Sequence, residues 1–210
     1  MSSLSVAILG KNSRWILDYS LRAVRSALRE VGRDVEVVYV DGGSTDGSKE
    51  LVREVLPQAR IIDAPGTNIP EARNIAVKET SGEYLVCWDS DISAPPSALK
   101  ALLQQDKPIV ALMRRDVYVA SEEEIQNIMA GLSDDQSPTA YPVSFVVFSV
   151  TLFHRDVQKG GALRREDDAG GGPRHMPKGI LQGLPKLLHL HGGLRHKQEA
   201  AERRPCNYAA

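Results

Sequence analysis

The chain has 210 residues, of which 42% are hydrophobic, and its formal net charge at pH 7 is −1. This length accommodates one domain with a sizeable core, and the near-neutral charge gives no argument for a nucleic acid or a membrane surface as a general partner. The two cysteines give no disulfide framework, which fits a cytoplasmic protein, and no window approaches the roughly 20 apolar residues of a membrane-spanning helix.

Strand-like apolar runs alternate with helix-like segments through the first 157 residues. Strands are predicted at residues 5–9, 35–40, 60–62, 84–88, 108–112 and 143–153, and helices begin near residues 14, 48, 70, 95 and 121. Repeated strand–helix units predict an α/β fold with a doubly wound, mostly parallel sheet. Ligands of such sheets bind outside the carboxyl ends of the strands, so functional residues are expected there.

Three carboxylates stand where two of the predicted strands end. Asp41 directly follows strand 35–40, and Asp89 and Asp91 directly follow strand 84–88. All three are therefore expected on one rim of the sheet, where they repel one another unless a cation or hydrogen-bond donors are present. Mg²⁺ and Mn²⁺ prefer oxygen ligands of this kind. The alternative is that Asp89 caps the next turn and Asp91 is only solvated.

The loop DGGSTDGS at residues 41–48 is the second signal. Its glycines allow tight turns, and Ser44, Thr45 and Asp46 can cap the helix that follows. The spacing is neither that of a dinucleotide fingerprint nor that of a P-loop, which disfavours an ordinary dinucleotide or ATP site. Asp41 precedes the turn and can accept hydrogen bonds from a nucleobase. The alternative is a loop and helix cap without a ligand.

The segment NIPEARN at residues 68–74 is the third signal, because it places a guanidinium one turn into a helix that opens with Pro70. Arg73 in that position can clamp a diphosphate. Two alternatives stay open: Arg73 pairs with Glu71, or its stem covers apolar surface.

In this order and spacing, SVAILGKN, VVYVDGGSTDGS and IPEARNIAVKETSGEYLVCWDSD resemble the family 2 glycosyltransferases with the GT-A fold, over about residues 4–157. The resemblance implies a nucleotide-diphosphate sugar as donor, with UDP or GDP, and Mn²⁺ or Mg²⁺ as the metal. It implies that Asp41 contacts the base, that Asp89 lies near the ribose and the metal, and that Asp91 is the main metal ligand. Arg73 would lie close to the diphosphate.

The same resemblance implies two further sites. Gly10, Lys11 and Asn12 would border the nucleotide, although only Asn12 matches the family's usual Pro-Thr-x-Asn pattern at residues 9–12. Inverting members also need a general base from a Glu-Asp pair well after the metal motif. The candidate in order is Asp167 within REDD, for which a solvated loop is the alternative.

Residues 158–210 differ in composition from what precedes them. They are net basic and rich in glycine and histidine, their apolar residues follow no sustained period, and Gly183 and Pro185 break any helix there. Two explanations stay open: a basic tail that touches acidic lipid or a partner at the inner face of a membrane, or a shifted reading frame after about residue 157. We therefore divide the chain into a nucleotide-sugar-binding domain, 1–157, and an irregular tail.

Three functions compete. The leading hypothesis is a metal-dependent glycosyltransferase acting on an unknown acceptor hydroxyl. The second is a non-catalytic nucleotide-sugar-binding remnant that lacks the acceptor half and needs a partner chain. The third, a sugar-nucleotide-forming nucleotidyltransferase, expects a glycine-rich basic loop directly after the first strand. Residues 10–14, GKNSR, contain a single glycine, which disfavours the third hypothesis.

Overall fold

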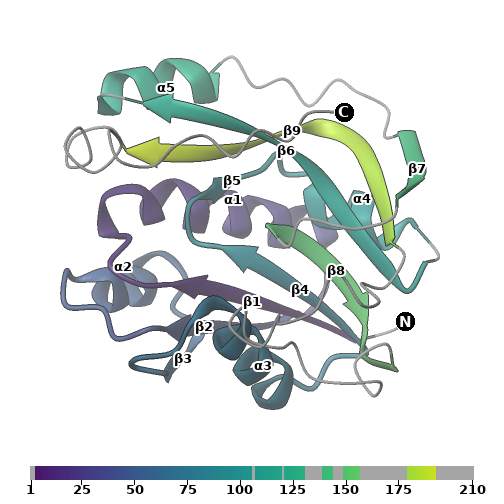
Figure 1. Ribbon diagram of the computed structural model, residues 1–210, viewed down its shortest axis with the longest axis horizontal. Coiled ribbons are helices and arrows are strands. Elements are labelled where there is room, and N and C mark those ends of the chain that lie inside the picture. The colour runs from purple at the N-terminus through teal and green to yellow at the C-terminus, as the bar shows by residue number, and fades with distance from the viewer. Residues whose placement is uncertain are drawn as a thin grey trace, which may run out of the picture.

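The computed structural model describes residues 3–105, 107–119, 121–130, 139–143, 149–156 and 179–192. The strands are β1 (Leu4–Gly10), β2 (Glu36–Asp41), β3 (Arg60–Asp63), β4 (Tyr84–Asp89), β5 (Ile92–Ser93), β6 (Ile109–Val119), β7 (Thr139–Val143), β8 (Val150–His154) and β9 (Gly179–Gly192). The helices are α1 (Arg14–Val31), α2 (Ser48–Val55), α3 (Ile69–Glu79), α4 (Ala98–Leu103) and α5 (Glu122–Ala130). The strands form one sheet in the order β3-β2-β1-β4-β8-β6-β9-β5, with β7 paired to β9 (Figure 1).

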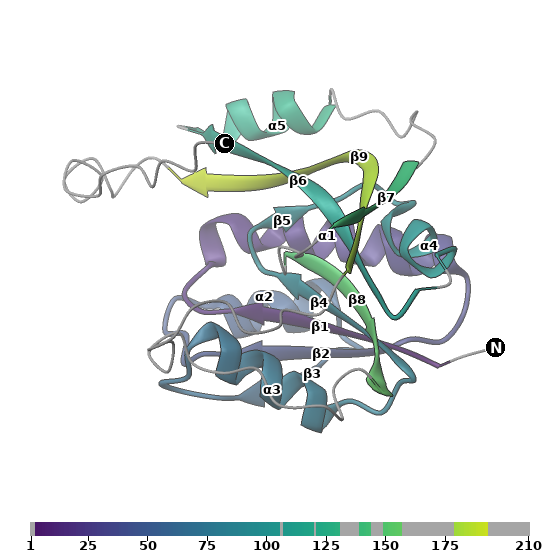
Figure 2. The same ribbon diagram turned by 45° about the vertical axis from the view of Figure 1, so that its right-hand side comes forward.

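β1 lies at the centre of the parallel half of the sheet. It pairs in parallel with β2 on one side and β4 on the other, and β3 pairs in parallel with β2. Helices α1 and α2 cover one face of these strands and α3 covers the other (Figure 1 and Figure 2). The predicted doubly wound α/β architecture is confirmed.

Alternate residues of these strands enter two hydrophobic cores. Val6 and Trp88 belong to the core under α1, whereas Ala7 and Cys87 pack with Ala76 of α3. Because both faces are buried, the strands read as nearly continuous apolar runs in the sequence. Burial raises the pKa of the Cys87 thiol to about 12, so this cysteine packs as a small hydrophobic residue, as predicted.

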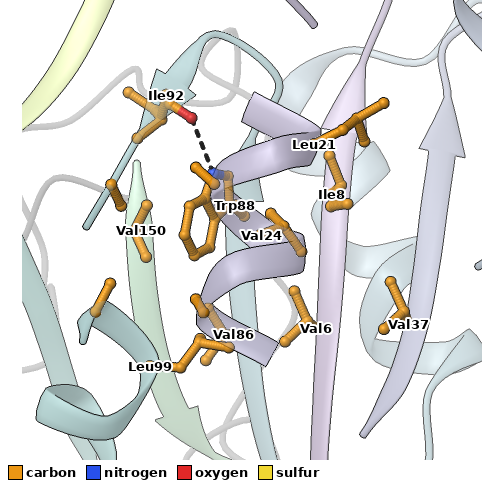
Figure 3. Packing of buried hydrophobic residues seen from close by; sticks show 14 of the residues in the cluster. Val6, Ile8, Leu21, Val24, Val37, Val86, Trp88, Ile92, Leu99 and Val150 are labelled. Carbon is orange, nitrogen blue, oxygen red and sulfur yellow. Dashed lines mark hydrogen bonds between the residues drawn. The ribbon is translucent and has the colours of Figure 1, made fainter. Parts of the chain in front are cut away.

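Trp88 is the largest side chain of the core under α1. Its indole is fully buried and lies among Val24 of α1, Leu99 of α4 and Val150 of β8 (Figure 3). Val150 is also its cross-strand partner in the β4–β8 pair. One core therefore joins the two helices to the last residues of β4, just before the predicted metal motif.

The sheet departs from the parallel pattern beyond β4. β8 pairs antiparallel with both β4 and β6 and thus separates two strands that run in the same direction. An apolar run carries no mark of its direction, so the sequence did not reveal this antiparallel strand. β6 continues to Val119, well past the predicted end at residue 112. The prediction stopped short because the segment MRRDVYV lacks the apolar pattern that indicates a strand.

Strand β9 lies within the segment expected to be irregular. It pairs in parallel with β6. The register shifts between Leu112 and Arg114 of β6, whose partners in β9 are Gln182 and Leu187. Gly183 and Pro185, which argued against a helix, fall in this shift, where a strand tolerates them. Asp167 lies outside the described residues. Among the helices that the structure describes, none combines the length and apolar character needed to cross a membrane.

Candidate functional site

Strand register brings two of the predicted carboxylates to one rim of the sheet. Gly10, the last residue of β1, is the register partner of Asp41, and the preceding Leu9 is the partner of Asp89. With one strand between them, their Cα atoms lie roughly 10 Å apart, twice the usual spacing of neighbouring strands. The amide of Gly42 bonds the Gly10 carbonyl at 2.9 Å and that of Ser90 bonds the Leu9 carbonyl at 3.0 Å. The predicted convergence of Asp41 and Asp89 is confirmed.

Asp41 is fully buried, and only one of its two carboxylate oxygens is hydrogen-bonded within the described residues. Its Oδ2 accepts hydrogen bonds from the amides of Gly43, at 3.0 Å, and Ser44, at 2.8 Å. Its Oδ1 is buried without a hydrogen-bond partner among the described residues. A buried carboxylate oxygen left unpaired is costly, and it attracts an incoming N–H or O–H donor. This oxygen is therefore the strongest local sign of a ligand.

The loop after β1 is locked to the loop after β2 by Asn12. The backbone amide of Asn12 donates to Ser44 Oγ, and the side-chain Oδ1 of Asn12 accepts from the backbone amide of Thr45, both at 2.9 Å. Asn12 adopts a left-handed φ of 50°, which asparagine tolerates better than most residues. The expectation that Ser44 and Thr45 cap α2 is therefore wrong: Gly47 is the N-cap residue, and the Ser44 hydroxyl and the Thr45 backbone amide bond Asn12. Asn12 is the residue of the family pattern that the sequence retains.

Asp46 tethers the starts of α1 and α2 to the same loop. Its Oδ2 accepts from the Arg14 amide at 2.9 Å, and its Oδ1 accepts from the hydroxyl and amide of Ser48 at 2.6 and 3.1 Å. Burial works to raise the pKa of Asp46, but these hydrogen bonds outweigh it and the pKa lies below its usual value. The charged carboxylate thus engages the first turn of α2, as predicted for this residue.

Arg73 projects from the second turn of α3 to the end of β4. Its Nη2 lies 3.2 Å from Asp89 Oδ1 and 3.5 Å from Oδ2, and the two side chains are 14% and 27% exposed. The alternative partner, Glu71, forms a reciprocal capping box with Asn68, both bonds being 2.9 Å long. Sequence analysis missed the Arg73–Asp89 pair because it depends on which strand α3 packs beside.

The predicted metal motif, Asp89-Ser90-Asp91, forms the tight connection between β4 and β5. The Asp89 amide donates to the Ser149 carbonyl at 2.9 Å, and the Trp88 indole N–H donates to the Ile92 carbonyl at 3.1 Å (Figure 3). Asp91 is partly exposed within this turn. No group of three His, Cys, Asp or Glu that could hold a metal ion occurs among the described residues.

The Tyr39 hydroxyl packs beside Gly10 at the same rim, a contact that the sequence did not indicate. A Cβ atom added to Gly10 would lie 2.6 Å from the Tyr39 hydroxyl and 2.9 Å from Ser90 Cβ. Burial, and then the charge of Asp41, raise the pKa of Tyr39 to about 12. Glycine therefore stands where the family pattern has threonine because the Tyr39 hydroxyl and Ser90 fill the space of a side chain.

Residues 5–160 match the family described as "Glycosyl transferase family 2". The chondroitin synthase of Pasteurella multocida is 34% identical over 91 residues, which are 42% of this chain and 9% of that protein. The succinoglycan biosynthesis protein ExoO of Rhizobium meliloti is 29% identical over 124 residues, 53% of this chain and 36% of that protein. The chain thus spans well under half the length of these relatives.

Two solved structures share the fold. S. aureus TarS 1-349 in complex with UDP-GlcNAc has a TM-score of 0.59 at 14% identity, over 92% of this chain and 60% of that chain. The mannosyltransferase PcManGT from Pyrobaculum calidifontis, in complex with GDP-Man and Mn²⁺, has a TM-score of 0.53 at 19% identity, over 82% of this chain and 48% of that chain. These likenesses show the fold, which is the GT-A fold that the sequence predicted.

Proposed function

Since the chain belongs to glycosyl transferase family 2, we propose that it transfers a sugar from a nucleotide-diphosphate donor to an acceptor hydroxyl. The observation that carries this proposal is the buried Oδ1 of Asp41, which has no hydrogen-bond partner in the described part of the chain and lies on the rim that also holds the Asp89-Ser90-Asp91 turn. A nucleotide laid across the end of β1 would reach both. The acceptor is not specified by any residue described above.

Asp41 supports a base-binding role. An ionised carboxylate accepts hydrogen bonds only, so its free oxygen suits a base with a ring N–H. Uracil and guanine have such a group, and cytosine and adenine do not. Relatives of the same fold bind UDP-GlcNAc and GDP-Man, which agrees with UDP or GDP as the nucleotide of the donor. Asn12, Lys11 and Gly10 would border the nucleotide from the loop after β1.

Asp91 and Asp89 support a divalent metal site. Carboxylate oxygens suit Mn²⁺ or Mg²⁺, and such ions are often held by one or two carboxylates together with substrate phosphates and water. This donor set fits a turn with two aspartates, and the remaining ligands would come from the donor diphosphate. When bound, the ion would neutralise charge that develops on the leaving diphosphate.

Arg73 and Asp89 would act as a pair beside the diphosphate. The guanidinium holds the Asp89 carboxylate at 3.2 Å and would add a positive charge near the phosphates of the donor. Deprotonation of the acceptor hydroxyl is assigned to Asp167, which stays a prediction because it lies outside the described residues. The cytoplasmic location and contact with the inner face of a membrane also stay predictions.

Thermal unfolding with nucleotides tests the proposal. UDP or GDP should raise the unfolding temperature of the chain, and Mn²⁺ should enlarge the rise, because ligands that bind only the folded state stabilise it. CDP and ADP are the matched controls and should act weakly. Release of free sugar or of a glycosylated product from the preferred nucleotide sugar then separates an active transferase from a non-catalytic binding protein. If no nucleoside diphosphate stabilises the chain, the proposal is wrong.

A further inference from the structure

We propose that Trp88 is a positioning residue, whose indole N–H sets the conformation of the Asp89-Ser90-Asp91 turn and thereby the affinity for a divalent metal. This inference rests on the proposed function, because it concerns the same metal motif. Trp88 directly precedes Asp89, and its Nε1 donates to the Ile92 carbonyl, directly after Asp91, at 3.1 Å (Figure 3). One hydrogen bond therefore spans the whole motif.

Other hydrogen bonds hold the first two residues of the turn. The Asp89 amide bonds the Ser149 carbonyl, the Ser90 amide bonds the Leu9 carbonyl, and Ser90 packs against Gly10. The indole bond acts instead on Ile92, the residue that follows Asp91. The backbone on both sides of Asp91 is thus held, from Ser90 by β1 and from Ile92 by Trp88 and by the pairing of β5 with β9.

The donor itself is rigid, because the indole is packed on several sides. Val24, Leu99 and Val150 surround it, and both Trp88 and Ile92 are at most 1% exposed. A buried hydrogen bond between groups that cannot reach water is expensive to lose, since the Ile92 carbonyl would lose its indole donor. Tryptophan combines a large apolar body with an N–H donor, and this bond requires both properties.

The consequence is a link between the core and the metal site. The side chain of Trp88 points into the core under α1, and the alternation along β4 turns Asp89 to the other face, where Arg73 lies. Groups that orient metal ligands without touching the metal commonly change metal affinity about 10- to 100-fold when they are replaced. Loss of the indole N–H should therefore weaken metal binding in addition to destabilising the fold.

The test uses the full chain with two replacements of Trp88 and one control. Trp88→Phe removes the donor and part of the ring, whereas 3-benzothienylalanine in place of Trp88 keeps the bicyclic shape and removes only the N–H. Val86→Ala is the matched control, because Val86 is buried in the same core, two residues earlier on the same face of β4. The Mn²⁺ dissociation constant is measured at saturating UDP, and UDP affinity is measured without metal.

Both replacements should weaken Mn²⁺ binding about tenfold, at the lower end of that range, and leave metal-free UDP binding unchanged. Val86→Ala should lower the unfolding temperature but keep wild-type Mn²⁺ affinity. Wild-type Mn²⁺ affinity in the benzothienylalanine variant, or an equal loss in Val86→Ala, overturns the inference while the proposed function stands. If Trp88→Phe does not fold, the benzothienylalanine variant decides alone. Absence of Mn²⁺-dependent UDP binding in the wild type refutes the proposed function and the inference together.

Discussion

Arg73 of α3 and Asp89 at the end of β4 form an ion pair with a closest distance of 3.2 Å between Nη2 and Oδ1. The pair is largely buried and joins a helix on one face of the sheet to the rim where the predicted metal motif begins. Because the rim also holds Asp41 and Asp91, the guanidinium offsets part of a concentrated negative charge. Under the proposed function, the pair would therefore connect stability of the fold with binding of an anionic donor.

Arg73→Gln should weaken both properties. Removal of the guanidinium leaves Asp89 without this partner, and we expect a loss of about 1–2 kcal/mol in the free energy of unfolding and roughly tenfold weaker UDP binding. Urea unfolding and titration calorimetry measure the two effects. Arg53→Gln is the control, because Arg53 pairs with Glu50 at 3.4 Å on the open surface and should change neither quantity. Unchanged UDP affinity in Arg73→Gln contradicts its role at the diphosphate.

Asp41→Asn should abolish base selection while it preserves the loop. The amide oxygen can still accept from the Gly43 and Ser44 amides, but the NH₂ group then faces the position expected for the base. A donor opposite a ring N–H is repulsive, so UDP affinity should fall by 2–3 kcal/mol, an order-of-magnitude figure for an unpaired buried group. Titration with UDP and CDP measures the change. If the variant still prefers UDP to CDP as the wild type does, Asp41 does not read the base.

Convergence of Asp41 and Asp89 could be predicted because it follows from two parallel strands whose ends are visible in the sequence. The two strands read as continuous apolar runs, and each run ends at its aspartate. Parallel strands place their carboxyl ends at one rim, so no knowledge of the strand order was needed. The start of α3 at Pro70 was equally accessible, since proline in a first turn is a local signal.

Features that depend on contacts between distant segments could not be predicted in this way. The pairing of β8 antiparallel to β4 has no local signature, and β9 itself contains glycine and proline. Gly10 departs from the family pattern, and the sequence gives no local reason for it. The reason is the Tyr39 hydroxyl, which comes from another strand and fills the space of a side chain at Gly10. These features arise from tertiary packing, which a residue pattern along one chain does not encode.

Asp91→Asn should remove the dependence of nucleotide binding on Mn²⁺ and leave the fold intact. Asp91 lies in the turn at the rim and is partly exposed, so its neutral isostere can be accommodated. The stabilisation by UDP should become the same with and without Mn²⁺ in thermal unfolding. Asp63→Asn is the control, because Asp63 ends β3 on the same rim and pairs with Lys49 at 3.0 Å. Retained Mn²⁺ dependence in Asp91→Asn contradicts the metal assignment.

Gly10→Ala should destabilise the chain, and Tyr39→Phe should relieve part of the loss. The new Cβ atom would lie 2.6 Å from the Tyr39 hydroxyl, a distance that forces a shift and costs about 1–3 kcal/mol. Tyr39→Phe removes that hydroxyl, although the contact with Ser90 Cβ at 2.9 Å persists. A double-mutant cycle by urea unfolding should therefore give a coupling energy of about 1 kcal/mol. Additive effects would show that the hydroxyl does not exclude a side chain at Gly10.

Tyr39 should also make stability fall at alkaline pH. Burial and the charge of Asp41 raise its pKa to about 12 in the folded chain, from an ordinary value of 10.0. Because the folded pKa is the higher one, the neutral phenol stabilises the fold fully below pH 10, and this contribution is lost as the pH rises through 12. At pH 11 roughly 1 kcal/mol should have been lost, about half of the contribution expected from a shift of two units.

The matched variant for this alkaline loss is Tyr39→Phe, which cannot ionise. Urea unfolding at pH 9 and pH 11 gives the change in free energy of unfolding for both chains, and their difference removes the contributions of other titrating groups. The wild type should lose roughly 1 kcal/mol more than the variant over this interval. Equal losses in the two chains would mean that Tyr39 ionises as easily in the folded as in the unfolded chain. The tight packing of its hydroxyl beside Gly10 argues against that outcome.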